Sequence, residues 1–429
     1  MYWLKSHLSV LASTLLLVVT PFVAEAQSIT RGPYLQMNAA SSIVVRWRTD
    51  VPTKSLVDYG TSATKLGSRA VRSALVTEHS VKLSKLKPDS RYFYRVHTNS
   101  QSPAPSDGVY SFRTASSDGR KPFKIWVLGD AGSSGTQTSG ENPVQASVRD
   151  AFLAKYPLST INLVLMLGDN AYNSGTDVEY QQGMFNPYQK ILSSVASVST
   201  QGNHDRTEGA YYPVFTLPER GQLGGAASGT EAYFSFDFGN AHFISLNSEI
   251  TTPAVRESML RWLRQDLSAN KKKWTIVFFH HPPFSRGSHN SDDDADSGGR
   301  MRWVRENVLP IVERFGVDLV MTGHSHNYER SKLLHGYYGT AETFSPSFVL
   351  QDSNGRDASA YRKRGKQGAV YLLAGNGGWV VHEGTLNHPA MVVSSREAGS
   401  VSLDFQDRSL NVTMVTAAGA VGDYFSIRK

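Results

Sequence analysis

The sequence of 429 residues contains no cysteine. A chain without cysteine forms no disulfide framework, so the burial of apolar side chains has to stabilise its fold. The absence also excludes a thiol nucleophile and a thiolate metal ligand. Any metal site in this protein must therefore use the oxygen and imidazole donors of Asp, Glu, Asn, Tyr or His.

The sequence also lacks low-complexity tracts, basic stripes and, beyond its first residues, long apolar runs. No segment after residue 26 is long and apolar enough to predict a transmembrane helix. The net charge is +7 and the pI is about 9.3, but the basic residues are scattered and are not interleaved with aromatic side chains. The positive balance can help to attract anionic substrates, and we expect no nucleic-acid scaffold as a partner. The sequence indicates no oligomeric state.

Residues 1–26 have the order of a secretory signal peptide. Lys5 stands near the start, an uncharged apolar run follows, and Ala24-Glu25-Ala26 forms a small-x-small cleavage site. A membrane anchor is the alternative, but the apolar part is short for a span and no basic stop follows it. We expect cleavage after Ala26 and export, either to the periplasm or out of the cell.

The length favours two domains, because one hydrophobic core rarely grows to this size. Residues 28–116 contain alternating apolar and polar runs separated by turn residues, which predict an N-terminal all-β sandwich. One stretch of this region, residues 86–96, resembles the fibronectin type III pattern, with a Pro-Asp turn before a tyrosine-rich run. The predicted strands are residues 41–49, 54–60, 78–86, 90–98 and 108–115.

A linker rich in Ser, Gly and charged residues, 115–122, ends this region. From residue 121 to residue 429, apolar runs alternate with helical patterns, which predicts an α/β domain with buried strands. Asn142 and Pro143 have the residue types of a helix N-cap and first position. Two further helices are expected over 254–270 and 301–316, with a break at Pro310 in the second of them.

Polar residues follow five of the buried runs of the α/β region, each at the point where the run ends. Because the carboxyl ends of strands form the active-site edge of an open α/β sheet, we expect these side chains to meet. Each short motif alone is also typical of an ordinary turn, whereas five of them in order indicate a metal site. The residues are Asp130; Asp169 and Tyr172; Asn203, His204 and Asp205; His280 and His281; and His324 and His326.

His324 and His326 follow the last of these runs with one residue between them. In extended backbone, residues two apart project from the same face, whereas in a helix they diverge. The two imidazoles can therefore reach one small volume without crowding a single atom. This spacing predicts two neighbouring metal ions, each with one of the two histidines.

The order GDAG, GDNAY, GNHD, VFFH and GHSH resembles that of the metallophosphoesterases, and specifically that of the purple acid phosphatases. Gly132 stands where most metallophosphoesterases have a histidine, and Tyr172 supplies the tyrosine of the purple enzymes. Residues 370–378 also look like a glycine-rich segment of that family. The resemblance implies a metallophosphoesterase catalytic domain over 121–429, with helices flanking its sheets, metals at the strand ends, and an N-terminal β-sandwich before it.

The resemblance also implies how the ligand residues are divided between the two metal ions. Asp130, Tyr172 and His326 would hold one ion, Asn203, His280 and His324 would hold the other, and Asp169 would bridge them. Carboxylate and phenolate suit Fe(III), while the amide and imidazole donors suit a divalent ion such as Zn, Fe or Mn. His204 would be the general acid, His289 would contact substrate, and Asp205 would orient His204 or support the ligands from behind.

The function implied is that of an exported acid phosphatase, in which metal-activated hydroxide attacks a phosphate monoester. A phosphodiesterase or nucleotide pyrophosphatase on the same metal centre is the alternative, with residues 209–230 and 287–300 as candidate selectivity loops. A binding protein that keeps the metals only for stability is a third interpretation. Within the second loop, Asp292, Asp294 and Asp296 are expected to form a solvated acidic turn, because the glycine and glutamate of a calcium loop are missing.

Overall fold

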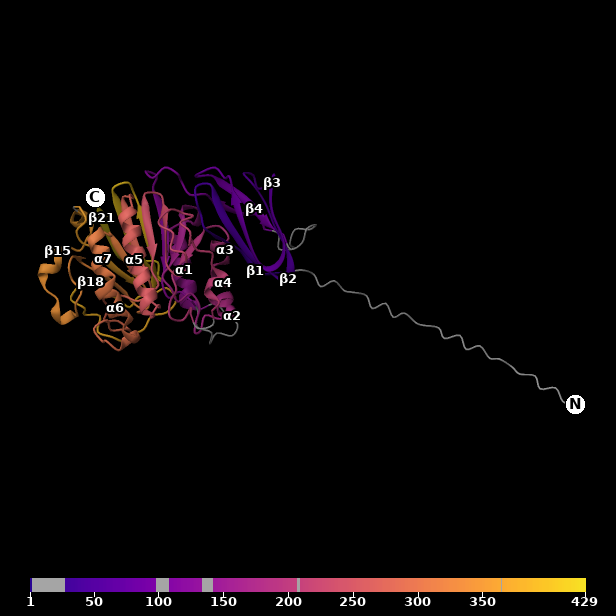
Figure 1. Ribbon diagram of the computed structural model, residues 1–429. Coiled ribbons are helices and arrows are strands. Elements are labelled where there is room, and N and C mark those ends of the chain that lie inside the picture. The colour runs from indigo at the N-terminus through magenta and orange to yellow at the C-terminus, as the bar shows by residue number, and fades with distance from the viewer. Residues whose placement is uncertain (2–27, 98–107, 133–141, 207–208, 364) are drawn as a thin grey trace.

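The computed structural model describes residues 1, 28–97, 108–132, 142–206, 209–363 and 365–429 (Figure 1). The expected signal peptide lies outside the described residues except for Met1. Among the helices described, none is long and apolar enough to cross a membrane.

The N-terminal part is β-rich, as predicted, and its five strands form one antiparallel hydrogen-bonded sheet. The longest strand, β2 (Ser42–Gly60), pairs along much of its length with β3 (Ser68–Ser84). It also pairs with β1 (Ile29–Gln36) and, at a different place, with β4 (Arg91–Val96). The sequence predicts two strands there, over 41–49 and 54–60. The structure joins them, because a register shift between Arg48 and Thr53 lets the chain bend while pairing continues. The strands are β1 (Ile29–Gln36), β2 (Ser42–Gly60), β3 (Ser68–Ser84), β4 (Arg91–Val96) and β5 (Tyr110–Arg113).

Residues 121–429 are called the catalytic part, because the family resemblance implies that they hold the active site. They contain two seven-stranded mixed sheets. The first has the order β16 (Tyr361–Arg362), β21 (Val421–Arg428), β20 (Ser409–Thr416), β19 (Gly399–Phe405), β6 (Phe123–Leu128), β7 (Leu163–Met166), β8 (Ser197–Ser199). The second has the order β18 (Met391–Ser395), β13 (Tyr328–Ser331), β17 (Val370–Ala374), β12 (Leu319–Thr322), β11 (Trp274–Phe278), β10 (Ala241–Ser245), β9 (Phe234–Phe238). A short pair, β14 (Leu333–Leu334) and β15 (Val349–Gln351), stands apart from them. This arrangement confirms the α/β prediction for the second region.

The three helical segments that the sequence predicts are present close to their expected positions, and among the described residues the structure adds three short α-helices that were not predicted. The Asn142 side chain accepts a hydrogen bond from the Val144 amide at 2.9 Å, so it caps the first helix as expected. The predicted break also occurs, because one helix ends at Asn307 and the next carries Pro310 in its first turn. The helices are α1 (Pro143–Lys155), α2 (Asp177–Tyr180), α3 (Asn186–Leu192), α4 (Tyr211–Val214), α5 (Pro253–Ala269), α6 (Arg300–Asn307) and α7 (Leu309–Phe315).

Alternation along the strands divides the core between the two faces of each sheet. In β11, Ile276 and Phe278 belong to the large core that also contains the first sheet, whereas Val277 packs with α5 and α7. On the first sheet, the Trp126 ring stacks on Phe152 of α1 at 4.5 Å. The two sheets therefore pack through their inner faces, and helices cover their outer faces.

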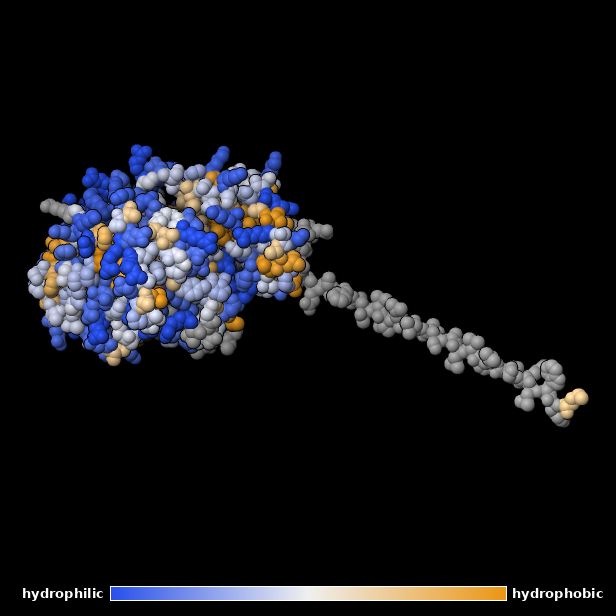
Figure 2. Space-filling view, in the orientation of Figure 1, coloured by the Kyte–Doolittle hydropathy of each residue, from blue (hydrophilic) through white to orange (hydrophobic). Residues whose placement is uncertain are grey.

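The N-terminal sheet packs against one end of the catalytic part (Figure 1). The buried Tyr94 hydroxyl donates to the Ser193 carbonyl at 2.8 Å, and the buried Arg31 guanidinium pairs with Asp177 at 2.7 Å. Figure 2 shows mostly polar surface over the catalytic part and an apolar area over the N-terminal sheet. Val71 and Leu75 of β3 are 55% and 65% exposed. This sheet is thus fixed to the catalytic part while keeping apolar side chains in solvent.

Candidate metal centre

The predicted metal ligands meet where the parallel strands of both sheets end. β6, β7 and β8 are parallel neighbours in the first sheet, and β11 and β12 are parallel neighbours in the second. The two edges touch, because the His324 amide donates to an Asp130 carboxylate oxygen at 2.8 Å. The sequence-based expectation that five strand ends share one edge is therefore confirmed.

Three of these residues have left-handed backbone at the strand ends. Asp130 and Asp169 each have φ of 52°, and His324 has φ of 73°. This region costs a non-glycine residue about 1–3 kcal/mol and is found mainly where surrounding contacts impose it. Here the turn aims the carboxylates and the imidazole across the edge of the sheets instead of along the strands.

The first group of donors consists of Asp130, Tyr172 and His326. The Tyr172 hydroxyl lies 3.3 Å from His326 Nε2 and 3.4 Å from Asp130 Oδ1. His326 Nε2 is 3.6 Å from the same Asp130 oxygen. The phenol, the imidazole and the carboxylate therefore face one point, which suits a hard cation.

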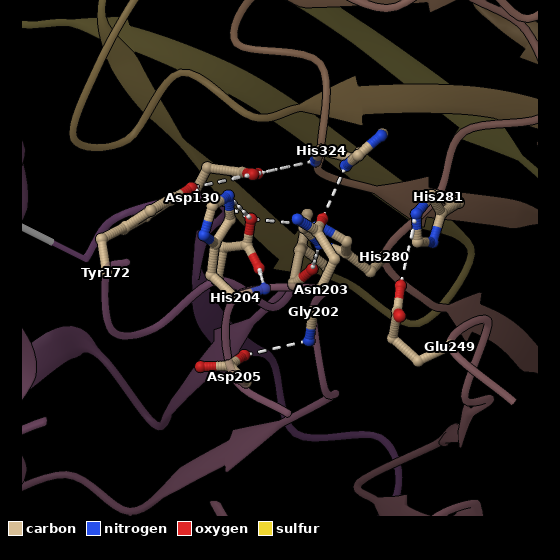
Figure 3. Close-up of polar contacts among 12 residues, drawn as sticks. Asp130, Tyr172, Gly202, Asn203, His204, Asp205, Glu249, His280, His281 and His324 are labelled. Atoms are coloured by element: carbon tan, nitrogen blue, oxygen red, sulfur yellow. Dashed lines mark hydrogen bonds and ion pairs between the residues drawn. The ribbon is translucent and has the colours of Figure 1, made fainter. Parts of the chain in front are cut away.

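The second group consists of Asn203, His280 and His324. The Asn203 side-chain oxygen lies 3.0 Å from His280 Nε2 and 2.9 Å from His324 Nδ1 (Figure 3). The other ring nitrogen of each histidine is already held, His280 Nδ1 by the Leu167 carbonyl and His324 Nε2 by Ser297. Each imidazole thus turns its free nitrogen toward the amide oxygen, as metal-binding histidines do.

Asp169 joins the two groups through a single oxygen. Its Oδ2 lies 3.1 Å from the Tyr172 hydroxyl and 3.3 Å from His280 Nε2. Asp130 Oδ1 also reaches both groups, but its contact with the second group is to the His324 backbone amide and not to a side-chain donor. The position of Asp169 fits the bridging role that the family resemblance implies.

The electrostatics of the protein atoms also fit a pair of cations. Burial together with Asp169 and Asp130 raises the pKa of the Tyr172 phenol well above 10. Burial by itself would lower the pKa of His280, but Asp169 and Asp130 outweigh it and raise that pKa to about 10. The site thus retains protons at donor atoms that a bound cation would displace. Among the described residues, two groups of three have ligand atoms within 4.8 Å of one another: Asp169, His280 and His324, and His289, Asp296 and His324.

His204 lies beside the bridging carboxylate. Its Nε2 is 4.0 Å from Asp169 Oδ2, and its ring packs on Tyr172 with centroids 4.5 Å apart. His204 Nδ1 donates to the Asn173 carbonyl at 2.7 Å, which leaves Nε2 directed at the site (Figure 3). The side chain is 35% exposed, so a ligand can reach it.

Asp205 takes a different position from a group that would contact substrate. It is fully buried, and its oxygens accept hydrogen bonds from Tyr180 at 2.6 Å, from Asn170 at 2.8 and 3.0 Å, and from the Gly202 amide at 2.9 Å. None of these donors is the His204 imidazole. Asp205 therefore braces the loops that carry Asp169 and Asn203, which corresponds to the second of its two expected roles and makes it a positioning residue. Burial, followed by the charge of Asp169, raises the pKa of Asp205 to about 7.

His289 reaches the edge of the centre. Its ring stacks on His324 with centroids 3.9 Å apart, and its Nδ1 lies 2.8 Å from an Asp296 oxygen. Asp296 also accepts from Ser297 Oγ at 2.7 Å, and Ser297 Oγ is 2.6 Å from His324 Nε2. The expectation of a solvated acidic turn is therefore wrong for Asp296, which links His289 through Ser297 to a predicted ligand.

No sequence motif points to Ser297 or Glu249 as site residues. Ser297 has a φ of 55°, a conformation that no sequence pattern signalled at a serine. Glu249 lies 3.3 Å from His281 Nε2 (Figure 3). Ser248 Oγ lies 2.9 Å from His281 Nδ1. These contacts fix the buried His281 ring against His324, at a centroid distance of 4.2 Å. The sequence signal that was available is His281 itself, a second histidine directly after His280, which indicates a residue that supports the predicted ligands.

The fold and this site together define a metallophosphoesterase with a dinuclear metal centre. Family comparison agrees, since residues 123–328 match the calcineurin-like phosphoesterase model and residues 31–114 match the purple acid phosphatase N-terminal domain.

Individual relatives point to the same family. The chain is 24% identical to purple acid phosphatase 18 of Arabidopsis thaliana, over 80% of this chain and 75% of the relative. It is 26% identical to acid phosphatase type 7 of Homo sapiens, over 79% of this chain and 75% of the relative. The structure of purple acid phosphatase PPD1 from yellow lupin superimposes with a TM-score of 0.71 at 17% identity, covering 93% of this chain and 74% of that one. The chain belongs to the purple acid phosphatase family and is a phosphoric ester hydrolase.

Proposed function

We propose that this protein is an exported phosphatase that hydrolyses small phosphate monoesters at two metal ions. The observation that carries the proposal is the position of Asp169 Oδ2, within 3.3 Å of donor atoms from both ligand groups and 4.0 Å from His204 Nε2. A carboxylate shared by two donor sets, with a histidine beside it, is an arrangement suited to two-metal hydrolysis of a phosphoester with a proton donor for the leaving group.

We assign the site of Asp130, Tyr172 and His326 to Fe(III) and the site of Asn203, His280 and His324 to Zn, Fe or Mn. Phenolate and carboxylate are hard anionic donors, and amide oxygen with two imidazoles suits a divalent ion. When bound, the two ions would supply Lewis acidity toward water and toward phosphate oxygens.

His204 is the group from which the leaving oxygen takes a proton. Because His204 Nδ1–H donates to the Asn173 carbonyl, the second proton of the imidazolium resides on Nε2, which faces the site. Transfer from Nε2 to the departing alkoxide prevents the build-up of charge on that oxygen. His289, whose Nδ1 is held by Asp296, presents its other ring nitrogen to substrate oxygens.

Turnover of matched substrates tests this function. We would measure initial rates of the purified, metal-loaded protein on an aryl phosphate monoester and the corresponding diester, with His324→Ala as the inactive control. Monoester turnover that is lost in His324→Ala supports the proposal. Faster diester hydrolysis would instead favour the phosphodiesterase alternative, and no turnover of either ester by fully loaded protein would refute the function.

Export rests on residues 1–26 and has a separate test. A C-terminally tagged chain expressed with and without residues 1–26 should differ in its location, with the full chain outside the cytoplasm and shortened at its N-terminus. Full-length tagged protein that stays in the cytoplasm would refute export without touching the catalytic proposal.

A further inference from the structure

Several arginines gather around one buried carboxylate next to the metal centre. Glu249 Oε2 lies 2.9 Å from Arg206 Nε and 3.4 Å from Arg300 Nε. Glu249 is 7% exposed, whereas the side chains of Arg206 and Arg300 are 52% and 15% exposed. The guanidinium groups thus lie between the buried carboxylate and solvent.

This cluster is connected to a predicted ligand by two separate routes. Through Glu249, it reaches His281 at 3.3 Å, and the His281 ring packs on His324. Through Arg300, whose Nη1 donates to the Ser297 carbonyl at 2.7 Å, it reaches the serine that holds His324 Nε2. Arg206 also follows His204 in the sequence by two residues. The cluster therefore borders the side of the centre formed by Asn203, His280 and His324.

The positive charge of the cluster exceeds its negative charge. Arg256 of α5 adds a third guanidinium, which stacks 4.2 Å above the Trp303 ring and donates to the Ile250 carbonyl at 2.7 Å. Burial and the charge of Arg300 lower the pKa of Arg256, so the two arginines act on each other directly. Arg300 Nε lies within ion-pair distance of Glu249 but makes no hydrogen bond to it or to any other residue that the structure describes. Glu249 is therefore paired with two guanidinium groups, and a third lies close to Arg300, which leaves capacity for a further anion.

We propose that Arg206 and Arg300 form a binding site for a second phosphate group of the substrate. The site selects phosphoesters that carry a second anionic group beyond the one at the metals, such as organic diphosphates or bisphosphates. This inference rests on the proposed phosphoesterase function and specifies its substrate class. Guanidinium groups suit such a ligand, because they bind phosphate through paired N–H donors and keep their charge at all relevant pH values.

Three substrates with the same alkyl chain test the proposal. Butyl phosphate has one phosphate, butyl diphosphate has a second one in anhydride linkage, and butane-1,4-diol bisphosphate has a second one on a separate ester. We expect Arg300→Gln and Arg206→Gln each to lower kcat/KM for at least one two-phosphate substrate about tenfold more than for butyl phosphate. Which substrate responds identifies the linkage that the site accepts.

Arg302→Gln is the matched control. Arg302 is on the same helix as Arg300, and its substitution by Gln removes the same charge. The Arg302 side chain is 44% exposed and pairs with Asp294. If Arg300→Gln and Arg206→Gln change the ratio of kcat/KM values no more than Arg302→Gln does, the proposal is wrong. Arg206→Gln alters a half-exposed side chain, so it tests the site even if Arg300→Gln fails to fold.

A binding measurement separates failure of this inference from failure of the proposed function. If the wild-type protein hydrolyses none of the three esters, the phosphatase proposal fails. Calorimetric titration of the metal-loaded protein with butane-1,4-diol bisphosphate and with butyl phosphate then tests whether the arginines bind a second phosphate group. Tighter binding of the bisphosphate that is lost in Arg206→Gln supports the site, and equal affinities for the two esters would overturn it.

Discussion

Tyr172 is the residue on which the iron assignment depends. A buried phenol between two carboxylates has its pKa raised well above 10, so only a strong Lewis acid makes it a phenolate at neutral pH. We expect Tyr172→Phe to abolish a visible charge-transfer band while leaving the far-UV circular dichroism unchanged. Tyr180→Phe is the control, because Tyr180 is also buried but donates to Asp205 instead of facing the predicted metal donors. A band that persists in Tyr172→Phe would exclude tyrosinate ligation.

Substitution of His204 tests whether this residue donates a proton to the leaving oxygen. Removal of a general acid lowers rates by about 10²–10⁴-fold. We expect His204→Asn to lower kcat on alkyl phosphates by that amount but to affect 4-nitrophenyl phosphate much less, because 4-nitrophenolate leaves without a proton. Metal content should stay as in the wild type. Equal losses on both substrates would contradict the role of acid, and His335→Gln, at a half-exposed histidine that pairs with Glu313, controls for loss of an imidazole elsewhere.

Ser297 supports a ligand from outside the donor set. With Nδ1 of His324 turned to Asn203, the Nε2–H group is left to donate to Ser297 Oγ at 2.6 Å. Loss of such a partner typically weakens metal binding by about 10–100-fold. Ser297→Ala should therefore lower affinity at the second metal site, measured by competition with a chelator, and leave the first site unchanged. Ser258→Ala, on the exposed face of α5, should change neither affinity.

At the scale of elements, the strand ends were predictable and the loops between them were not. Apolar runs followed by Asp, Asn or His identify the edge of a sheet, and the structure brings all seven predicted ligands to that edge. The turn at Asp296 and Ser297 is set by left-handed backbone and by contacts with residues that are close only in the folded chain. A sequence pattern carries no record of such contacts, so the acidic turn resembled a solvated one.

A second element-scale feature is a buried histidine that joins β9, β10 and α5. His242 lies between two carboxylates, with Nδ1 2.8 Å from Asp237 and Nε2 2.7 Å from Asp266. Burial lowers the pKa of His242, but the two carboxylates outweigh it and raise the pKa to about 9. Lys272 adds a cation 3.4 Å from Asp237. The protonated imidazole therefore holds the hairpin to the helix.

The pairing of His242 with Asp237 and Asp266 makes the fold less stable at alkaline pH. Because the pKa of His242 is higher in the folded protein than in the unfolded chain, its contribution is complete below about pH 6.5 and is lost as pH rises through about 9. We expect the free energy of unfolding to fall by about 2–3 kcal/mol more in the wild type than in His242→Gln between these pH values. Denaturant titrations at several pH values, with metal content held constant, measure the difference. Parallel pH dependence in the two proteins would show that His242 is not protonated.

At the scale of the whole molecule, the predicted metal donors come from both sheets of the catalytic part, and none of them comes from the N-terminal sheet. Asp130, Asp169 and Asn203 follow strands of the first sheet, whereas His280, His324 and His326 follow strands of the second. Asp130 and Asp169 are almost completely buried, and unpaired carboxylates in such a position are costly. Bound cations would therefore stabilise the contact between the two sheets as well as the reaction.

Removal of the metals should consequently destabilise the strand ends of the catalytic part and leave the N-terminal sheet intact. A ligand that binds only the folded state stabilises it by about 4 kcal/mol at a thousandfold excess over its dissociation constant. We expect chelation to lower the melting temperature and to increase amide hydrogen exchange after β6, β7, β11 and β12. Exchange in the paired region of β2 and β3 should not change, because those strands contribute no donor. Uniform loss of protection, including β2 and β3, would instead mean that the N-terminal sheet, fixed by Tyr94 and Arg31, unfolds as one unit with the catalytic part.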